Sequence, residues 1–479
     1  MSRFTFLSCV LLLLPLVLSS SSMAEDSSKR ISQAEAVEDV QQFFSTMQRV
    51  HPDLLAKVDL KEYLNLKQQT MDEITKKLDT DGKIGVKDLA YMLYYASAFF
   101  QDGHTSVNWQ FQSNGTNSPG KLFPPFRLRY DNGRFLVASS SDKSMEGLEV
   151  RSVNGKPIQE FLSPILDSCS GETLVFKANR FTNIQTLWYS FSGLLASTPS
   201  LDLVLRDSQG KRSERSVETL ALADFDKVEN KSLFRLKQRL SEGTHIRFLD
   251  SDKIAHFVYP SFKYNDEEKK KIDGIFADIK SRGTQDLIID IRGNGGGTSN
   301  IGDYIFSYLY DGKFTPFSKI RIKLSEDVLS SVAKDWKVPK DAEIEGLIVT
   351  WEIGDQSFPT KPQSFFRGRT FLLVDNGTFS SATDFAAMFR DYEVGKILGY
   401  ETGGLPCCFG DVYSFNLKNS GISCGVSWKQ FFGPKPRPGD DEHGVLPDIP
   451  MSDMTLKPYL KEDDPVLAFT LDHIKKTRH

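Results

Sequence analysis

The spacing of apolar and polar residues changes twice along this chain of 479 residues. Between about residues 32 and 100, apolar side chains such as Val40, Phe43 and Phe44 recur every three or four positions. That period predicts helices with one buried face. The helical pattern ends at Asp102-Gly103, which is typical of a turn.

The second pattern runs from about residue 120 to 220 and consists of short runs rich in β-branched and aromatic residues. Turn signals such as Asp131-Asn132-Gly133 and Asn154-Gly155 separate these runs. They predict a small, mostly β module. A charged stretch at residues 224–242 predicts a helical connector after it.

The remaining half alternates predicted strands with predicted helices, which indicates a parallel sheet with helices on its faces. The expected strands are residues 254–259, 287–291, 370–374 and 396–399, and the expected helices are residues 267–279, 301–310 and 382–389. The fold class expected is therefore α/β, with a parallel-sheet core in the second half.

The N-terminus has the pattern of a secretory signal. Arg3 precedes an apolar stretch at residues 4–18, and small residues lead to a predicted cleavage point after Ala24. The stretch is too short to span a bilayer comfortably, so we expect a secreted protein without a membrane span after cleavage. Asn114 and Asn230 lie in glycosylation sequons.

Composition narrows the class of partner. The formal net charge of −4, without a long basic run, argues against nucleic acid. The histidines lack metal-ligand spacing, so we expect no metal and no cofactor. Four cysteines remain after the signal, and they leave two possibilities open: free thiols, or one disulfide from Cys424 to Cys407 or Cys408. The sequence gives no oligomeric state.

Two loops that follow predicted strands carry candidate chemistry. The glycine-rich loop from Asp290 to Thr298 fits a phosphate cradle, an oxyanion hole or a tight turn. The loop at residues 375–385 places serines at a strand–helix junction, where helix amides stabilise negative charge. A serine there is more often a simple helix cap, and an isolated His104 in a turn is more often a surface residue.

Taken together and in order, these pieces resemble the C-terminal processing peptidases, a family of serine endopeptidases related to the tricorn core and to retinoid-binding repeats. The motifs are Asp-x-Arg-x-Asn-Gly-Gly-Gly from Asp290, Ser-Ser-Ala-x-Asp-Phe from Ser380, Gly-Tyr-Glu-Thr-Gly-Gly from Gly399 and Gly-Val-x-Pro-Asp-Ile from Gly444. The resemblance covers about residues 254–451.

The resemblance implies an architecture. It predicts a ClpP/crotonase-like parallel-sheet core at residues 223–479 and a PDZ-like β module at residues 119–222. An N-terminal helical domain at residues 25–118 carries His104, and residues 1–24 form the signal peptide.

The resemblance also implies roles. Ser381 matches the nucleophile, and the N–H of Ala382 with that of Gly295 or Gly296 would form the oxyanion hole. Many members use a lysine base just after the Gly-Glu-x-Thr-x-Gly turn, but Leu405 stands there.

Another branch of the family uses a histidine in an Asp-Gly-His-Thr motif with a late acidic residue. Here those residues are His104 and Glu442, with Asp441 as the alternative acid. A His-containing triad of Ser381, His104 and Glu442 is therefore expected to hydrolyse protein or peptide substrates through an acyl-enzyme. The alternatives are a non-catalytic ligand- or peptide-binding protein on the same fold and a nucleotide-dependent enzyme that uses the glycine loop.

Overall fold

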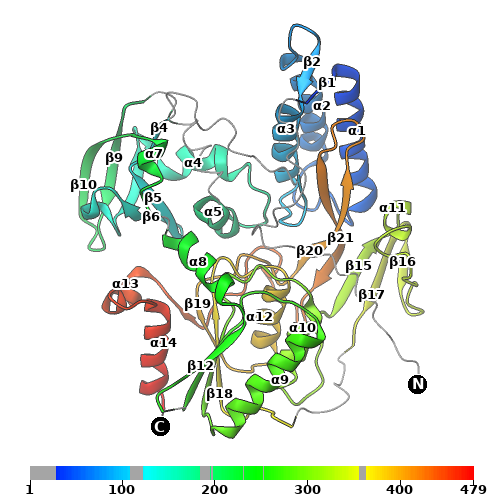
Figure 1. The fold of residues 1–479 in the computed structure, drawn as a ribbon. Coiled ribbons are helices and arrows are strands. Elements are labelled where there is room, and N and C mark those ends of the chain that lie inside the picture. The colour runs from blue at the N-terminus through cyan, green and yellow to red at the C-terminus, as the bar shows by residue number, and fades with distance from the viewer. Residues whose placement is uncertain are drawn as a thin grey trace.

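The computed structural model describes residues 29–107, 122–183, 195, 198–229, 231–251, 253–354 and 363–478. Figure 1 shows three parts: a group of N-terminal helices, a β module beside it, and a larger part built on a parallel sheet. The predicted signal peptide and the sequon residues Asn114 and Asn230 lie outside the described residues. Among those residues, no helix is both long enough and apolar enough to cross a bilayer.

The N-terminal part contains α1 (Gln33–Val50), α2 (Leu60–Lys76) and α3 (Val86–Ala98), as the apolar period predicted. A capping box between Ser32 and Glu35 begins α1. A two-stranded antiparallel sheet of β1 (Arg30–Ser32) and β2 (Lys83–Gly85) accompanies the helices. The buried face of α1 includes Phe43, Phe44 and Met47.

These helices share one apolar core with an antiparallel sheet that the sequence did not predict. The sheet has the order β16-β17-β15-β21-β20, and β3 pairs with β21. Its strands are β3 (Ser106–Val107), β15 (Lys319–Lys323), β16 (Glu343–Glu345), β17 (Ile348–Glu352), β20 (Cys408–Asn416) and β21 (Ser423–Phe432). Val107 pairs with Cys424, so the turn before β3 is fixed against the second half of the chain.

The β module has the sheet order β10-β9-β7-β6-β5, with β8 (Lys156–Pro157) on β7 and a separate pair of β4 (Leu122–Phe123) and β11 (Leu220–Ala221). The main strands are β5 (Phe126–Asp131), β6 (Arg134–Ser140), β7 (Glu149–Val153), β9 (Ser200–Arg206) and β10 (Arg212–Glu218). Two helices that were not predicted, α4 (Ile158–Leu166) and α5 (Leu174–Asn183), join its core. The predicted helical connector is α7 (Leu222–Phe225) and α8 (Lys231–Glu242).

The second half forms a sheet in the order β12-β13-β14-β18-β19-β22. Every pair from β13 to β22 is parallel, as the strand–helix alternation predicted, and β12 is antiparallel to β13. The strands are β12 (His245–Leu249), β13 (Ile254–Val258), β14 (Asp286–Asp290), β18 (Arg369–Val374), β19 (Lys396–Gly399) and β22 (Ile449–Pro450).

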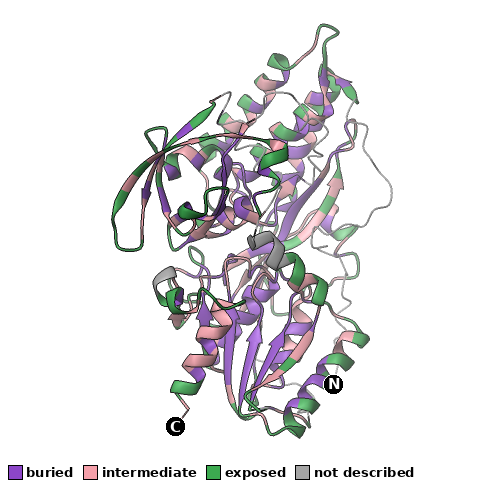
Figure 2. Ribbon diagram, turned by 60° about the vertical axis from the view of Figure 1, so that its left-hand side comes forward, coloured by how far each residue is buried: buried purple, intermediate pink, exposed green. Residues whose placement is uncertain are grey.

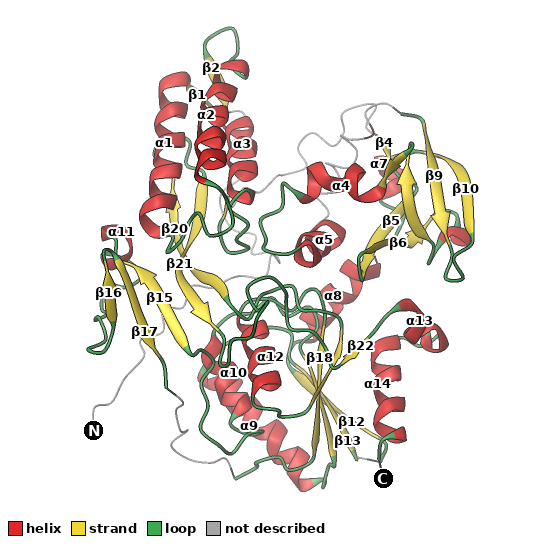
Figure 3. Cartoon of the chain, turned by 180° about the vertical axis from the view of Figure 1, so that it is seen from behind, coloured by secondary structure: helices red, strands yellow, loops and turns green. Residues whose placement is uncertain are grey.

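Alternate residues of these strands enter two different cores. Leu287 and Ile289 of β14 pack under α9 (Asp266–Ser281), α10 (Ser299–Phe306) and α12 (Ser381–Asp391). Ile288 packs on the other face, toward α14 (Pro465–Lys476). Helices therefore cover both faces, and the strands between them are buried (Figures 2 and 3). Two further short helices are α11 (Glu326–Leu329) and α13 (Asp453–Leu456).

The chain is thus a mixed α/β protein. The ClpP/crotonase-like core, the PDZ-like identity of the module and the domain boundaries remain predictions. The cysteines at positions 169, 407, 408 and 424 are all free thiols, so of the two possibilities for them the disulfide is wrong.

Candidate active site

The serine at the start of α12 has an unusual backbone. Ser380 occupies the N-cap position with φ 54° and ψ −132°, a region that non-glycine residues rarely adopt. Its hydroxyl caps no helix N–H. Instead, its Oγ lies 3.0 Å from Nε2 of His104. Ser380 is therefore not an ordinary helix cap, and its strained turn presents the hydroxyl to an imidazole.

Ser381, which we expected to face the histidine, points elsewhere. Its hydroxyl donates to the carbonyl of Gly297 at 2.9 Å and lies 3.0 Å from Oγ of Ser299. Ser381 is the first residue of α12, and the helical backbone turns its side chain toward the glycine loop. The hydroxyl that meets His104 therefore belongs to Ser380 and not, as expected, to Ser381. The reason is that the turn lies at Ser380, while Ser381 is already part of α12.

His104 lies in the turn between α3 and β3 and reaches across to the second half of the chain. His104 is 6% exposed, and its ring stacks on Phe379, with ring centroids 4.7 Å apart. Burial lowers the pKa of His104 below 6.5, against the opposing effects of Asp102, Asp411 and the Phe409 carbonyl. His104 thus reaches the serine turn, but the hydroxyl that it contacts belongs to Ser380 and not to the expected Ser381.

Asp102 is a buried carboxylate held by several donors. Its Oδ1 accepts the backbone N–H of His104 at 2.9 Å, and its Oδ2 accepts the hydroxyls of Thr105 at 2.5 Å and Ser427 at 2.6 Å. Nε2 of His51 lies 3.4 Å from Oδ2. Burial would raise the pKa of Asp102, but His51, His104 and Ser427 together hold it well below its usual range. The Asp-Gly-His-Thr motif contained this residue, although we assigned no role to it.

The acidic residue expected from the late motif is not beside His104. Glu442 is exposed in a turn, where its N–H donates to the Gly439 carbonyl, and it makes no ion pair or hydrogen bond with His104. Asp441, the alternative, is also exposed, and its carbonyl accepts Lys57. Both assignments are corrected, because the segment folds as a surface turn.

A carboxyl group from the β module, that of Glu172, lies near His104 instead. Both carboxyl oxygens of Glu172 are buried without a hydrogen-bond partner among the described residues. Burial, helped by the charge of Asp102, raises the pKa of Glu172 to about 8. A Cβ on Gly103 would lie 3.0 Å from Oε2 of Glu172, so glycine at that position permits the close approach. No sequence motif pointed to Glu172.

Aromatic stacking fixes the module to the site. The ring of Phe176, on α5, stacks on Phe379 at a centroid distance of 4.2 Å and an interplanar angle of 12°. Phe379 stacks in turn on His104. This column of three rings extends from the β module to the histidine.

The glycine loop abuts the serine turn. Gly296 has φ +96°, and a Cβ there would lie 2.7 Å from Cβ of Ser380. Asn294 holds the loop in place. Its side-chain amide donates to the Tyr259 carbonyl at 2.8 Å, and its backbone carbonyl accepts the N–H of Phe379 at 3.0 Å. The two loops are thus one connected structure.

Two of the expected oxyanion donors are already engaged. The N–H of Gly296 donates to Oδ1 of Asn294 at 2.8 Å, and the N–H of Ala382 donates to the Phe379 carbonyl at 3.2 Å. Those two assignments are corrected. The N–H groups of Gly295 and Ser381 donate no hydrogen bond to a described residue. Neither is engaged by a described residue, and the N–H of Ser381 directly follows Ser380.

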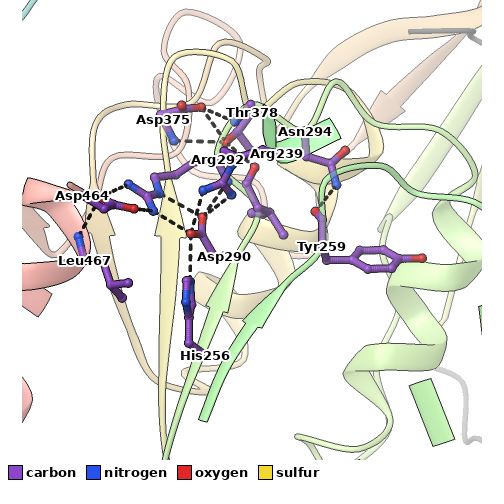
Figure 4. A network of polar contacts seen from close by, with 12 residues as sticks. Arg239, His256, Tyr259, Asp290, Arg292, Asn294, Asp375, Thr378, Asp464 and Leu467 are labelled. Atoms are coloured by element: carbon purple, nitrogen blue, oxygen red, sulfur yellow. Dashed lines mark hydrogen bonds and ion pairs between the residues drawn. The ribbon is translucent and has the colours of Figure 1, made fainter. Parts of the chain in front are cut away.

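The Asp-x-Arg part of the glycine motif is structural. Asp290, at the end of β14, accepts two hydrogen bonds from the guanidinium of Arg239 and two from that of Arg292, and Nε2 of His256 lies 3.1 Å away (Figure 4). Burial opposes ionisation, but Arg292 and Arg239 hold the pKa of Asp290 well below its usual value. Arg292 also binds Asp464, the N-cap of α14. This network anchors the base of the loop.

The same loop has little capacity left for a phosphate. The N–H of Gly293 donates to Oδ1 of Asp375 at 2.7 Å, and that of Gly296 donates to Asn294. A phosphate cradle needs such amides free.

Metal binding is a further possibility to test against the geometry. Donor atoms of Asp102, His104 and Glu172 lie within 4.8 Å of one another. Both oxygens of Asp102 already accept protein donors, and Nε2 of His104 faces Ser380. We therefore interpret the group as ionisable side chains that act on one another electrostatically around the histidine.

Comparison with known proteins places these residues in context. Residues 253–451 match the model of peptidase family S41. The solved structure of mature CPAF complexed with lactacystin has a TM-score of 0.58 and 15% identity, covering 93% of this chain and 98% of that one. The structure of mature CPAF alone has a TM-score of 0.56 and 16% identity, covering 93% of this chain and 97% of that one. No curated protein sequence matches the chain.

Proposed function

We propose that Ser380 is the nucleophile and His104 the general base of a serine-type peptidase, since residues 253–451 match the model of peptidase family S41. The observation that carries this proposal is the 3.0 Å contact between Oγ of Ser380 and Nε2 of His104. The strained backbone of Ser380 supports it, because strain of this kind persists where a function requires it.

The proposed reaction proceeds through an acyl-enzyme. Nε2 of His104 takes the proton of the Ser380 hydroxyl as Oγ attacks the carbonyl carbon of a peptide bond. The N–H groups of Gly295 and Ser381 stabilise the oxyanion that forms, together with the positive end of α12. His104 then gives the proton to the leaving amine, and water releases the acyl group by the same steps.

The electrostatics suit this cycle. Burial keeps His104 neutral at physiological pH, so its Nε2 can accept a proton. Asp102, ionised beside it, stabilises the imidazolium that forms in the transition state. The substrates are proteins or peptides, and the signal-like residues 1–24 support action outside the cytoplasm.

The non-catalytic alternative is less well supported. A binding protein on this fold would need neither a strained serine nor a buried histidine aimed at its hydroxyl. The nucleotide-dependent alternative is disfavoured by the engaged amides of the glycine loop.

Adjacent serines provide a matched test of the proposal. We predict that Ser380→Ala lowers kcat for peptide hydrolysis by about 10⁴-fold or more, as loss of a nucleophile does. Ser381→Ala removes one hydrogen bond to Gly297, worth about 1 kcal/mol, and should cost about tenfold or less. Steady-state kinetics of both purified variants measure this. The reverse ranking would refute the assignment of Ser380.

A further inference from the structure

The second nitrogen of His104 has no partner. Nδ1 is buried and makes no hydrogen bond among the described residues, although the Phe409 carbonyl faces the ring and favours its charged form. In the proposed reaction, which this inference presupposes, Nε2 takes the proton of Ser380 and both ring nitrogens then carry hydrogen. A buried N–H without an acceptor costs about 1–3 kcal/mol. The Phe409 carbonyl faces the ring without meeting hydrogen-bonding geometry, so the charged ring needs a further acceptor at Nδ1.

Asp102 is poorly placed to be that acceptor. Its Oδ1 lies 3.9 Å from Nδ1, beyond hydrogen-bonding distance, and already accepts the backbone N–H of His104. Its Oδ2 is occupied by the hydroxyls of Thr105 and Ser427. These bonds fix the carboxylate in place. Asp102 acts on the ring through its charge.

Glu172 has the complementary property. Its two carboxyl oxygens are buried and meet no described donor in hydrogen-bonding geometry, although the N–H groups of Gly103 and Glu172 favour the charged form. One of these oxygens lies within 4.8 Å of a ring nitrogen of His104. Gly103 leaves room for this approach, since a Cβ there would lie 3.0 Å from Oε2. An unpaired carboxyl is thus buried within 4.8 Å of a ring whose Nδ1 is also unpaired. A small shift of the long glutamate side chain would join them.

The column of rings holds Glu172 at this distance. Phe176 is four residues after Glu172 and stacks on Phe379, which stacks on His104. Thr173, the next residue, contacts the Gly403 carbonyl through its hydroxyl at 3.5 Å. The segment that carries Glu172 is thereby packed against the serine turn.

We propose that Glu172, supplied by the β module, is the carboxylate that accepts the Nδ1–H of His104 when the ring becomes charged. It is a positioning residue that acts through His104, and it takes the place expected for Glu442. The catalytic centre is then complete only while the β module is docked.

The proposal implies that kcat depends on pH in the alkaline range. Above about 8 Glu172 is ionised, and a carboxylate stabilises the imidazolium of the transition state better than a carboxylic acid does. Asp102 and Arg180 act electrostatically on both Glu172 and His104, and Asp411 acts on His104. Raising the pH through about 8 should therefore increase kcat.

The test uses Glu172→Gln in the full chain, with Glu160→Gln, an exposed glutamate of the same module, as the matched control. For Glu172→Gln we expect kcat to fall by about 10²- to 10⁴-fold, with KM within about twofold of wild type. The rise of kcat through about 8 should disappear. The melting temperature should stay unchanged or increase, because the substitution replaces an unpaired buried carboxyl with a neutral group. The control should match wild type in every respect.

The outcomes separate this inference from the proposed function. Wild-type kcat and an unchanged pH profile in Glu172→Gln, while Ser380→Ala is inactive, would overturn the role of Glu172 alone. Full activity of Ser380→Ala would overturn the proposed function itself. A lower melting temperature with kcat unchanged would identify Glu172 as merely structural and would also overturn the inference.

Discussion

At the scale of single residues, one backbone torsion decides which of two adjacent serines meets the base. The positive φ of Ser380 turns its hydroxyl to His104, while Ser381 is already helical and binds the Gly297 carbonyl. The sequence presents both serines in the same motif. To choose between them, one must know at which residue the helix begins. The turn before the helix packs against Gly296, which is 84 positions upstream of Ser380, so local sequence does not reveal it.

The protonation of His104 gives a prediction at this scale. The base must be neutral to accept the serine proton, and burial lowers its pKa below 6.5. On acidification, kcat/KM should therefore fall with an inflection below 6.5. A pH series with a peptide substrate measures it. An inflection at or above the ordinary histidine pKa would contradict the buried, neutral base.

At the scale of elements, the helices and parallel strands with strong periodicity were predicted well. The strand expected at residues 287–291 is β14, and the helix expected at 267–279 is α9. The antiparallel sheet was missed, because its strands come from distant segments: Val107 pairs with Cys424, and Lys319 pairs with Phe432. Such pairings leave little trace in local spacing.

The close contact between the glycine loop and the serine turn gives a prediction for these elements. In Gly296→Ala, the new Cβ would lie 2.7 Å from Cβ of Ser380 and 2.8 Å from the Phe379 carbonyl. We expect kcat to fall by about 10²-fold, the cost of displacing a catalytic group by about 1 Å.

The control for this prediction is Gly346→Ala. Gly346 also has a positive φ, +60°, but a Cβ there meets nothing within 4 Å. It should lose about 1–3 kcal/mol of stability through backbone strain and keep its activity. Equal kcat in the two variants, by steady-state kinetics at matched folded fraction, would show that the contact is unimportant.

At the scale of the whole molecule, the candidate site is assembled from three parts of the chain. The turn before β3 brings Asp102 and His104, the parallel-sheet part brings Ser380 and its glycine loop, and the β module brings Glu172. Figure 1 shows these three parts of the chain. The order of motifs predicted that a front-half histidine meets a rear-half serine. It could not predict Glu172, because a lone glutamate in a module carries no signal until the module is docked.

The most direct measurement of the whole account is to locate covalent labelling by a serine-reactive fluorophosphonate with peptide mass spectrometry. The account predicts a phosphonyl adduct on Ser380, abolished in Ser380→Ala, strongly reduced in His104→Ala and retained in Ser381→Ala. An adduct on Ser381, or labelling that persists unchanged in His104→Ala, would contradict it.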